Sequence, residues 1–257
     1  MNTKNLRRKI QGATMLVGAA GLAMPCSGCF FSGFGGSFAR TGPVQTETLS
    51  IPTGKAKSVR VHLKMGAGEI HVSGGAKNLM EGTIKYNVAD WKPDTSYNVD
   101  GSDGTLMIMQ PEGSHTNGGH VKYDWDLHFT DNTPLDIAVE MGAGESELNL
   151  SGLQLENFSL EAGAGNATVD MSGPWKKNVS ATFQGGVGSI RLKLPREVGV
   201  HVTIEGGLGS VSAPDFKRDG DAYVNDAYGK SPVTLEVHVE GGIGSVNLEL
   251  AGAEGPA

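Results

Sequence analysis

A glycine–any residue–glycine motif recurs six times in this chain, and each copy separates two runs in which apolar and polar residues alternate. Residues 135–153, LDIAVEMGAGESELNLSGL, show the pattern most clearly. Alternation of this kind is typical of a β-strand with one buried and one exposed face. The six motifs are Gly66-Ala67-Gly68, Gly142-Ala143-Gly144, Gly163-Ala164-Gly165, Gly186-Val187-Gly188, Gly207-Leu208-Gly209 and Gly242-Ile243-Gly244.

The spacing of the motifs indicates a repeat. Successive first glycines lie 76, 21, 23, 21 and 35 residues apart. A recurring interval of 21–23 residues is typical of a solenoid, in which each repeat forms one coil stacked on the next. We interpret the interval of 35 as one coil plus an excursion at residues 213–232. The interval of 76 then corresponds to one coil plus an insertion of about 55 residues.

The residue between the two glycines distinguishes a solenoid corner from a hairpin tip. It is apolar in every motif: alanine three times, then valine, leucine and isoleucine. A hairpin tip faces water, whereas a corner around a core can point its middle residue inward, with flanking glycines at positive φ. We therefore predict buried middle residues, with Leu208 in contact with Val187 and Ile243 of adjacent coils.

These patterns predict an all-β fold, a single-stacked, β-helix-like β-solenoid with Gly-x-Gly corners and an inserted antiparallel β meander. The meander corresponds to residues 80–130, where strand-like runs are joined by turns rich in glycine and aspartate. The insertion also contains the aromatic residues that the repeats lack. They include Trp91, Tyr97, Trp125 and Phe129.

The first 44 residues resemble an export signal followed by a linker. Residues 1–9 are basic, residues 10–24 are apolar, and Ser27-Gly28-Cys29 is similar to the end of a bacterial lipoprotein signal. We predict a signal peptide at residues 1–28, lipidation of Cys29, and a flexible Gly/Ser/Phe tether at residues 29–44. The protein would then be exported and held at a membrane by its lipid. Lipidation of Cys26, or a plain secretory signal with two incidental cysteines, are the alternatives.

The net charge excludes one class of partner. The chain carries a formal charge of −7, and residues 1–28 contribute four positive charges and no negative ones, so the remainder carries −11. Nucleic-acid binding needs a basic surface, and we therefore expect no nucleic-acid partner.

Several segments resemble the bacterial toast-rack family, in which an N-terminal module precedes a LiaF-like C-terminal β-solenoid. They are MGAGEIHVSGG, YNVADWKPDTSYNVDG, PLDIAVEMGAGESELNLSGL, SGPWKK, LPREVGVHV and DAYVNDAYG. The resemblance implies a toast-rack module at residues 45–134 and a LiaF-like solenoid at residues 135–252. It also implies a cell-envelope protein without an established activity, and the LiaF-like part suggests a role in envelope stress.

One polar column is the first candidate site. The residues two positions before each first glycine are Lys64, Glu140, Glu161, Gln184, Glu205 and Glu240. Stacking would align the four glutamates, and like charges on neighbouring strands repel each other. A bound cation such as Ca²⁺ could offset this repulsion; alternatively, each glutamate is solvated and screened.

The remaining candidates are loops and small polar residues. The excursion at residues 213–232 combines aspartates with aromatic residues, so it either folds over the solenoid or contacts another envelope protein. His115 and His120 flank a turn but have no third metal ligand nearby in the sequence, and we expect a solvated loop. The residues after four of the corners, Asn166, Ser189, Ser210 and Ser245, are expected to cap corner backbone groups.

These observations predict a non-catalytic, lipid-anchored envelope protein that acts in binding, scaffolding or stress sensing. We expect no catalytic residues, no metal and no cofactor. Phosphate binding in particular is not expected, because the glycine motifs lack the third glycine and the following helix of a dinucleotide-binding loop. The alternative is a polysaccharide-active β-helix enzyme. That function would require paired inward-facing carboxylates in an aromatic groove, which the pattern does not contain.

Overall fold

The computed structural model describes residues 38–112, 115–116 and 120–251. These residues form β-strands almost throughout, together with one short 3-10 helix, η1 (Ala89–Trp91). No helix in the described ranges is long and apolar enough to cross a membrane. The all-β fold class predicted from the sequence is confirmed.

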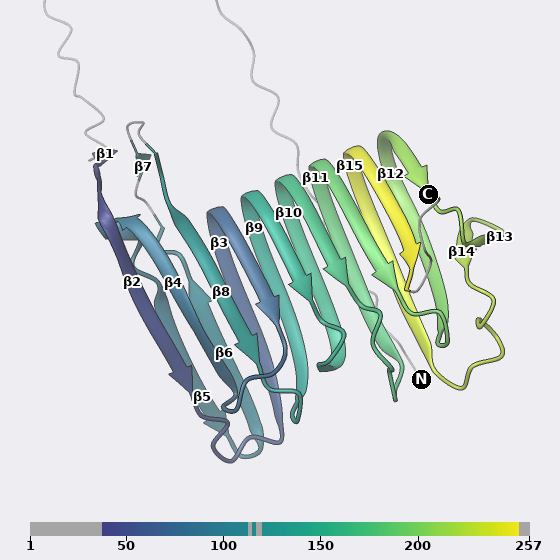
Figure 1. Ribbon diagram of the computed structural model, residues 1–257, viewed down its shortest axis with the longest axis horizontal. Coiled ribbons are helices and arrows are strands. Elements are labelled where there is room, and N and C mark those ends of the chain that lie inside the picture. The colour runs from purple at the N-terminus through teal and green to yellow at the C-terminus, as the bar shows by residue number, and fades with distance from the viewer. Residues whose placement is uncertain (1–37, 113–114, 117–119, 252–257) are drawn as a thin grey trace, which may run out of the picture. The chain divides into compact units, whose positions relative to one another are not determined.

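Six long strands form the body of the protein (Figure 1). Each strand rises along one side, bends over at its Gly-x-Gly motif and descends along the other side, so one strand makes one arch-shaped coil. Adjacent arches pair in parallel; Gly68, Gly144, Gly165 and Gly188 lie in one row. The six strands are β3 (Ser58–Ser73), β9 (Pro134–Asn149), β10 (Gln154–Asp170), β11 (Val179–Leu194), β12 (Gly199–Ser212) and β15 (Thr234–Leu250).

The apolar positions of the two sides meet inside the arches. Val139 and Leu148, on opposite sides of β9, are both almost fully buried. Phe158 and Phe183 pack one coil apart, with their ring centroids 5.5 Å apart. Burial of such side chains contributes about 1.5–3 kcal/mol each, so the alternating pattern that defines the strands also supplies the stability of the stack.

The corners differ from the prediction in one respect. Met65 and Ile70 both point into the core, although residues five apart in a regular strand face opposite sides. The bend supplies this change of phase and leaves the middle residue on the convex, outer side. The prediction of buried middle residues is therefore wrong for Ala67, Ala143, Ala164 and Val187, which are exposed.

The glycines of the corner are required by stacking as well as by the bend. Gly144 has a φ of 135° and Gly165 a φ of 136°, values that side-chain-bearing residues rarely adopt. A Cβ atom on Gly165 would also overlap the carbonyl oxygen of Gly144 in the neighbouring coil. The same relation links Gly163 to Gly142 on the other flank of the corner.

The insertion after β3 covers the N-terminal end of the stack. β6 (Asp103–Met109) and β8 (Tyr123–Phe129) pair in parallel with the first and second halves of β3, so together they imitate one more coil. The predicted antiparallel pairing is present further out, where β5 (Asp94–Asp100) pairs with β6, and β4 (Met80–Val88) with β8. β2 (Thr41–Ile51) forms the outer edge on β4, and β1 (Phe38–Ala39) pairs with β7 (His115–Thr116).

Aromatic side chains fill this end of the core. Tyr123 packs edge-on against Trp91 and Trp125, with centroid distances of 5.4 and 5.7 Å. Burial raises the pKa of the Tyr123 phenol. Trp91, Trp125 and Phe129 are buried as aromatic core residues, whereas Tyr97 is partly exposed and donates a hydrogen bond to the Thr53 carbonyl, 2.8 Å away.

The C-terminal end has an unexpected strand order. β15 lies between β11 and β12, so Ile243 is paired with both Val187 and Leu208. The prediction that Leu208 neighbours Val187 is wrong. β15 fits beside β11 because it extends three residues further and pairs Leu248 and Leu250 with leucines of β11, a continuation that β12 lacks.

The excursion between β12 and β15 contains two short strands. β14 (Ala222–Val224) pairs antiparallel with the first half of β12, and β13 (Lys217–Asp219) pairs with β14. The proposed boundary at residues 134–135 stays a prediction. β3 and β9, which lie on either side of this boundary, pair along nearly their full length.

Candidate functional site

The polar column expected from the sequence is formed by the strand register. Pairing between coils places its members in the order Lys64, Glu140, Glu161, Gln184, Glu240 and Glu205. All six residues are exposed, because each follows an inward-facing strand position and so points outward. The alignment follows directly from the constant offset of these residues from the glycine motif.

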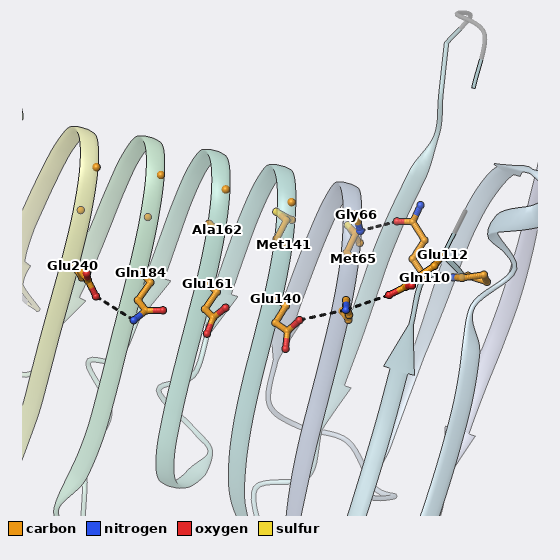
Figure 2. A pocket seen from close by; sticks show the side chains of 18 residues that line it. Met65, Gly66, Gln110, Glu112, Glu140, Met141, Glu161, Ala162, Gln184 and Glu240 are labelled. Carbon is orange, nitrogen blue, oxygen red and sulfur yellow. Dashed lines mark hydrogen bonds and ion pairs between the residues drawn. The ribbon is translucent and has the colours of Figure 1, made fainter. Parts of the chain in front are cut away.

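Contacts at the Lys64 end of the column and between Gln184 and Glu240 reduce the repulsion between its carboxylates (Figure 2). Lys64 Nζ lies 3.6 Å from Glu112 Oε1 and 3.8 Å from Glu140 Oε2. Gln184 Nε2 donates a hydrogen bond of 3.2 Å to Glu240 Oε2. The side chains of Lys64 and Glu140 are about half exposed and that of Glu112 is almost fully exposed, and such ion pairs contribute at most about 1 kcal/mol. The column is therefore a solvated surface feature with a defined spacing rather than a stabilising network.

A groove with a volume of about 870 Å³ runs beside the column. Its floor is the row of first glycines, including Gly142, Gly163 and Gly186, and it crosses the successive coils. One end is closed by residues 110–112. There the side-chain Oε1 atom of Gln110 accepts a hydrogen bond of 2.8 Å from the backbone amide of Gly66. The backbone amide of Gln110 donates a second hydrogen bond, also of 2.8 Å, to the Lys64 carbonyl.

The groove is anionic and has a backbone floor. Four carboxylates line it, from Glu112, Glu140, Glu161 and Glu240, against the single ammonium group of Lys64. No aromatic residue is found among the described residues that line it. The groove can therefore accept a long, narrow and positively charged ligand, but it offers no ring for stacking on a sugar.

Cation binding by the glutamates stays a prediction. In the described ranges, no three histidine, cysteine, aspartate or glutamate side chains are arranged to hold a metal ion. The order of residues in the column explains why its glutamates form no such group of three. Gln184 separates Glu161 from Glu240, and Lys64 ends the row.

The excursion at residues 213–232 folds onto the end of the solenoid, which is one of its two predicted roles. Phe216 and Tyr223 are partly buried against the core, and the Tyr228 ring stacks on His201 at a centroid distance of 5.2 Å. On its outer side, Lys217 Nζ lies 2.5 Å from Asp226 Oδ1, and this hydrogen bond lowers the pKa of the Asp226 carboxyl.

Asn225 anchors this excursion and was not identified from the sequence. Its side chain is buried, and its amide donates to the Val198 carbonyl at 2.7 Å. Its Oδ1 atom accepts hydrogen bonds from the amides of Val200 and Tyr228, both at 3.0 Å. The available signal was the turn-like NDAYG segment, which indicates a turn but not a buried amide.

The other predicted polar residues are spread over the surface. Ser189 Oγ donates to Asn166 Oδ1 of the neighbouring coil at 2.7 Å, so this pair bonds along the stack and not, as predicted, to the corner backbone. His201 Nδ1 lies 2.8 Å from Glu236 Oε2. His120 is exposed. Cys26 and Cys29 lie outside the described residues, as do the predicted signal peptide and most of the tether.

One arrangement resembles a hydrolytic triad in composition. Ser73 Oγ lies 2.7 Å from His128 Nδ1, and His128 Nε2 lies 3.3 Å from Asp126 Oδ1. These side chains stand on the outer face of two adjacent strands, whose facing backbone amides pair with each other. The strand amides that could stabilise an oxyanion are thus engaged in the sheet, and the contact is best explained as cross-strand pairing.

Comparison with known proteins identifies a matching family and a similar solved structure. The family model described as "N-terminal domain of toast_rack, DUF2154" matches residues 40–193. A solved structure from Clostridium sporogenes, provisionally described as a cell adhesion protein, is 31% identical. It matches with a TM-score of 0.79 and covers 81% of this chain and 100% of its own.

Other solved structures match with low TM-scores. A provisionally described adhesin from Bacteroides fragilis is 11% identical, with a TM-score of 0.30 and coverage of 81% of this chain and 99% of its own. A provisionally described lipid binding protein from Parabacteroides distasonis is 11% identical, with a TM-score of 0.22 and coverage of 83% and 97%. The comparison with curated proteins found no match. None of these descriptions assigns a catalytic activity.

Proposed function

Because this chain belongs to the toast-rack family, we propose that it is a non-catalytic binding protein of the cell envelope, held at a membrane by a lipid on Cys29. The similar Clostridium sporogenes structure, described in terms of cell adhesion, supports a role outside the cytoplasm. A part in envelope-stress signalling is a finer proposal that rests on the LiaF-like resemblance of the C-terminal repeats.

The observation that carries the binding role is the anionic groove beside the polar column. It crosses consecutive coils, so it can contact a ligand at a repeat of one strand spacing, about 4.8 Å. Four carboxylates against one lysine favour a positively charged ligand, and the glycine floor leaves backbone atoms accessible. We propose that the groove binds an extended basic segment of another envelope protein.

The excursion at residues 213–232 is a second proposed contact surface. Lys217 and Arg218 are exposed on its outer strand, and Arg218 lies over the Tyr223 ring, 4.4 Å from its centroid. This surface of charged and aromatic side chains lies at the end of the stack, away from the groove, and so it would contact a different part of a partner.

The groove is tested by reversing its charge and recovering partners from envelope extract. We expect the chain carrying both Glu140→Lys and Glu161→Lys to lose the proteins that the wild type retains, and to lose them at low salt as well. The chain carrying both Glu145→Lys and Glu197→Lys is the matched control, because it changes the net charge by the same amount at exposed positions outside the groove. Equal recovery by the groove variant and the wild type would contradict the proposal.

The anchor is tested separately by fractionation. Cys29→Ala should release the protein from membranes or leave its signal uncleaved, whereas Cys26→Ala should have little effect. Unchanged membrane association of the Cys29 variant would exclude the lipid anchor without affecting the groove experiment.

A further inference from the structure

The interior of the stack beneath the corners is packed unequally along its length. In each coil two inward-facing positions meet there, one directly before the first glycine and one two residues after the second. The first two coils fill these positions with Met65 and Ile70, and with Met141 and Ser146, all at most 4% exposed. Ser146 Oγ lies 3.4 Å from Met141 Sδ, so the two sides of the arch are in contact under the corner.

The last four coils have no large side chain in the methionine row. The strand register continues that row with residues that have one side-chain carbon or none: Ala162, Gly185, Gly241 and Gly206. A Cβ atom on Gly241 would meet no atom within 4 Å. The space that methionine side chains occupy in β3 and β9 is therefore left open in β15.

A cavity of about 100 Å³ lies beneath these corners. Its inward-facing side chains are apolar and include Ile190, Ile204 and Val246. The row that contains Ile190 and Val246 ends with Val211 on β12, which is 41% exposed, whereas Ile70 at the other end of that row is 1% exposed. The cavity therefore opens at the C-terminal end of the stack, where β12 is the last of the six arches (Figure 1).

The chemistry of the cavity suits a hydrocarbon. A polar group would find no side-chain partner at the inward-facing positions, and burial of such a group without a hydrogen bond is unfavourable. Water needs several polar partners, and apolar cavities of about 150 Å³ instead take up benzene-sized hydrocarbons. A volume of about 100 Å³ accordingly holds the end of one linear chain, on the order of four carbon atoms. The next methylene groups would then lie over Ile204 and Val211 at the opening.

Negative charge lies at this opening. Glu205 is among the residues that line the cavity, on the last coil, and Glu240 pairs with it in register on β15. Both residues are exposed. Carboxylates at paired positions of neighbouring strands repel each other, and a positively charged group beside them reduces this repulsion. The opening therefore favours a cationic head group over an anionic one.

We propose that this cavity binds a single-chain amphiphile with a positively charged head group. The end of its hydrocarbon chain fills the space beneath the corners, the following methylene groups cover Val211, and the head group lies beside Glu205. A two-chain lipid is disfavoured, because the cavity has room for one chain and the second would remain in water. The site is independent of the anionic groove, which lies on the outer side of the same corners.

Calorimetric titration of the purified full chain tests the class of ligand. We expect decylammonium to bind below the concentration at which it forms micelles. Butylammonium, which has the same head group and a short chain, should bind about tenfold more weakly or less. Decanoate, which has the opposite charge, should bind about fivefold more weakly. Equal binding of decylammonium and butylammonium would overturn the hydrocarbon site, and equal binding of decylammonium and decanoate would overturn the role of the head group.

Filling the cavity separates this site from attraction to the acidic surface, because it leaves the charge unchanged. Gly241→Met restores the side chain that Met141 supplies in β9, at a position where a Cβ is free of contacts. It should keep its melting temperature and lose affinity for decylammonium by about tenfold or more. Ala162→Met fills the same cavity from β10 and should act likewise. Val99→Met is the matched control, on the 39% exposed edge of β5, and should bind as the wild type does. Full affinity in both folded filling variants would overturn the proposal.

Two further measurements locate the head group and the chain. Glu205→Gln should reduce the preference for decylammonium over decanoate from about fivefold to about twofold, whereas Glu197→Gln, at an exposed position outside the cavity, should leave it unchanged. An unchanged preference in the Glu205 variant would contradict the placement of the head group. In NMR spectra, decylammonium should shift the methyl signals of Val246 and Val211 and leave that of Val121 in place. Equal shifts at all three valines would indicate unspecific adsorption and overturn the site.

Discussion

A Cβ atom on Gly144 would occupy the position of the Gly68 carbonyl oxygen in the neighbouring coil. The relation repeats along the stack, from Gly165 to Gly144 and from Gly188 to Gly165. The second glycine of each motif is therefore constrained twice, by its positive φ and by the close approach of the adjacent backbone. Corner glycines can be ranked by how many of these constraints they meet.

Gly144→Ala should destabilise the protein by about 3 kcal/mol or more, because the added methyl group meets a backbone oxygen that cannot rotate away. Gly241→Ala, just before the corner of β15, is the control. A Cβ there would find no atom within 4 Å, and we expect a change below about 1 kcal/mol. Urea unfolding of the two variants measures the difference, and similar losses would contradict the stacking explanation.

Val187→Asp should be tolerated. The Val187 side chain is 57% exposed at the middle of its corner, so an aspartate there stays hydrated, and we expect a change of about 0.5 kcal/mol or less. Val139→Asp, at a position that is 2% exposed, should cost about 3 kcal/mol or more because a carboxyl group would be buried without a partner. Melting temperatures compare the two variants. A strongly destabilised Val187→Asp variant would indicate that the middle residue of the corner faces inward after all.

Asn225→Ala should loosen the C-terminal excursion. The change leaves the Val198 carbonyl and the Val200 and Tyr228 amides without their side-chain partner, which should cost about 2–4 kcal/mol. Hydrogen exchange should increase at residues 198–200 and 222–228. Asn98→Ala, on the exposed β5 edge, should change neither stability nor exchange; an equal effect of the two substitutions would exclude the anchoring role.

Asp170 should contribute to the pH dependence of stability. Its burial would raise the pKa of the carboxyl, but hydrogen bonds from Ser172 and Lys193 outweigh this effect and lower it. A lowered pKa in the folded state means that the stabilisation is complete above the unfolded value of about 3.9, and is lost as the pH falls through the folded value. Asp170→Asn should therefore lower the melting temperature at pH 7, with a difference that closes below about pH 4. A constant difference from pH 7 to pH 2.5 would contradict this account.

The architecture could be predicted because its determinants are local and repeated. The glycine interval defines the coil, and alternation such as Val59, Val61 and Leu63 identifies the inner face without any long-range information. The register of the polar column follows from the same interval, so Glu140 and Glu161 could be placed side by side before the structure was known.

The orientation of the corner was harder to predict from the sequence. An apolar middle residue suggests burial, but the bend reverses the phase between Met65 and Ile70 and places Ala67 outside. Alanine and valine are tolerated there because single exposed apolar residues cost little. A glycine in a turn-rich segment can likewise be tightly packed: a Cβ on Gly104 would lie 2.9 Å from atoms of Tyr97 and Val59.

The order of the last strands could not be read from their corners. β12 and β15 present nearly the same residues to β11, EGGLGSVS and EGGIGSVN, and the choice depends on Leu248 and Leu250 beyond the corner. Asn225 was missed for a related reason. Its partners are backbone carbonyl and amide groups, and the identities of the residues do not show which backbone groups need a side-chain partner. The groove appears only when the first glycines are stacked, because no single coil contains it.

The position of β15 also sets the order in which the protein can mature. Synthesis delivers β12 before β15, yet β15 ends up inside the stack and β12 outside it. In the finished stack β12 pairs with β15 and not with β11. The native pairing of β12 therefore cannot form before β15 is in place, and the last two coils cannot be added in the order in which the chain runs.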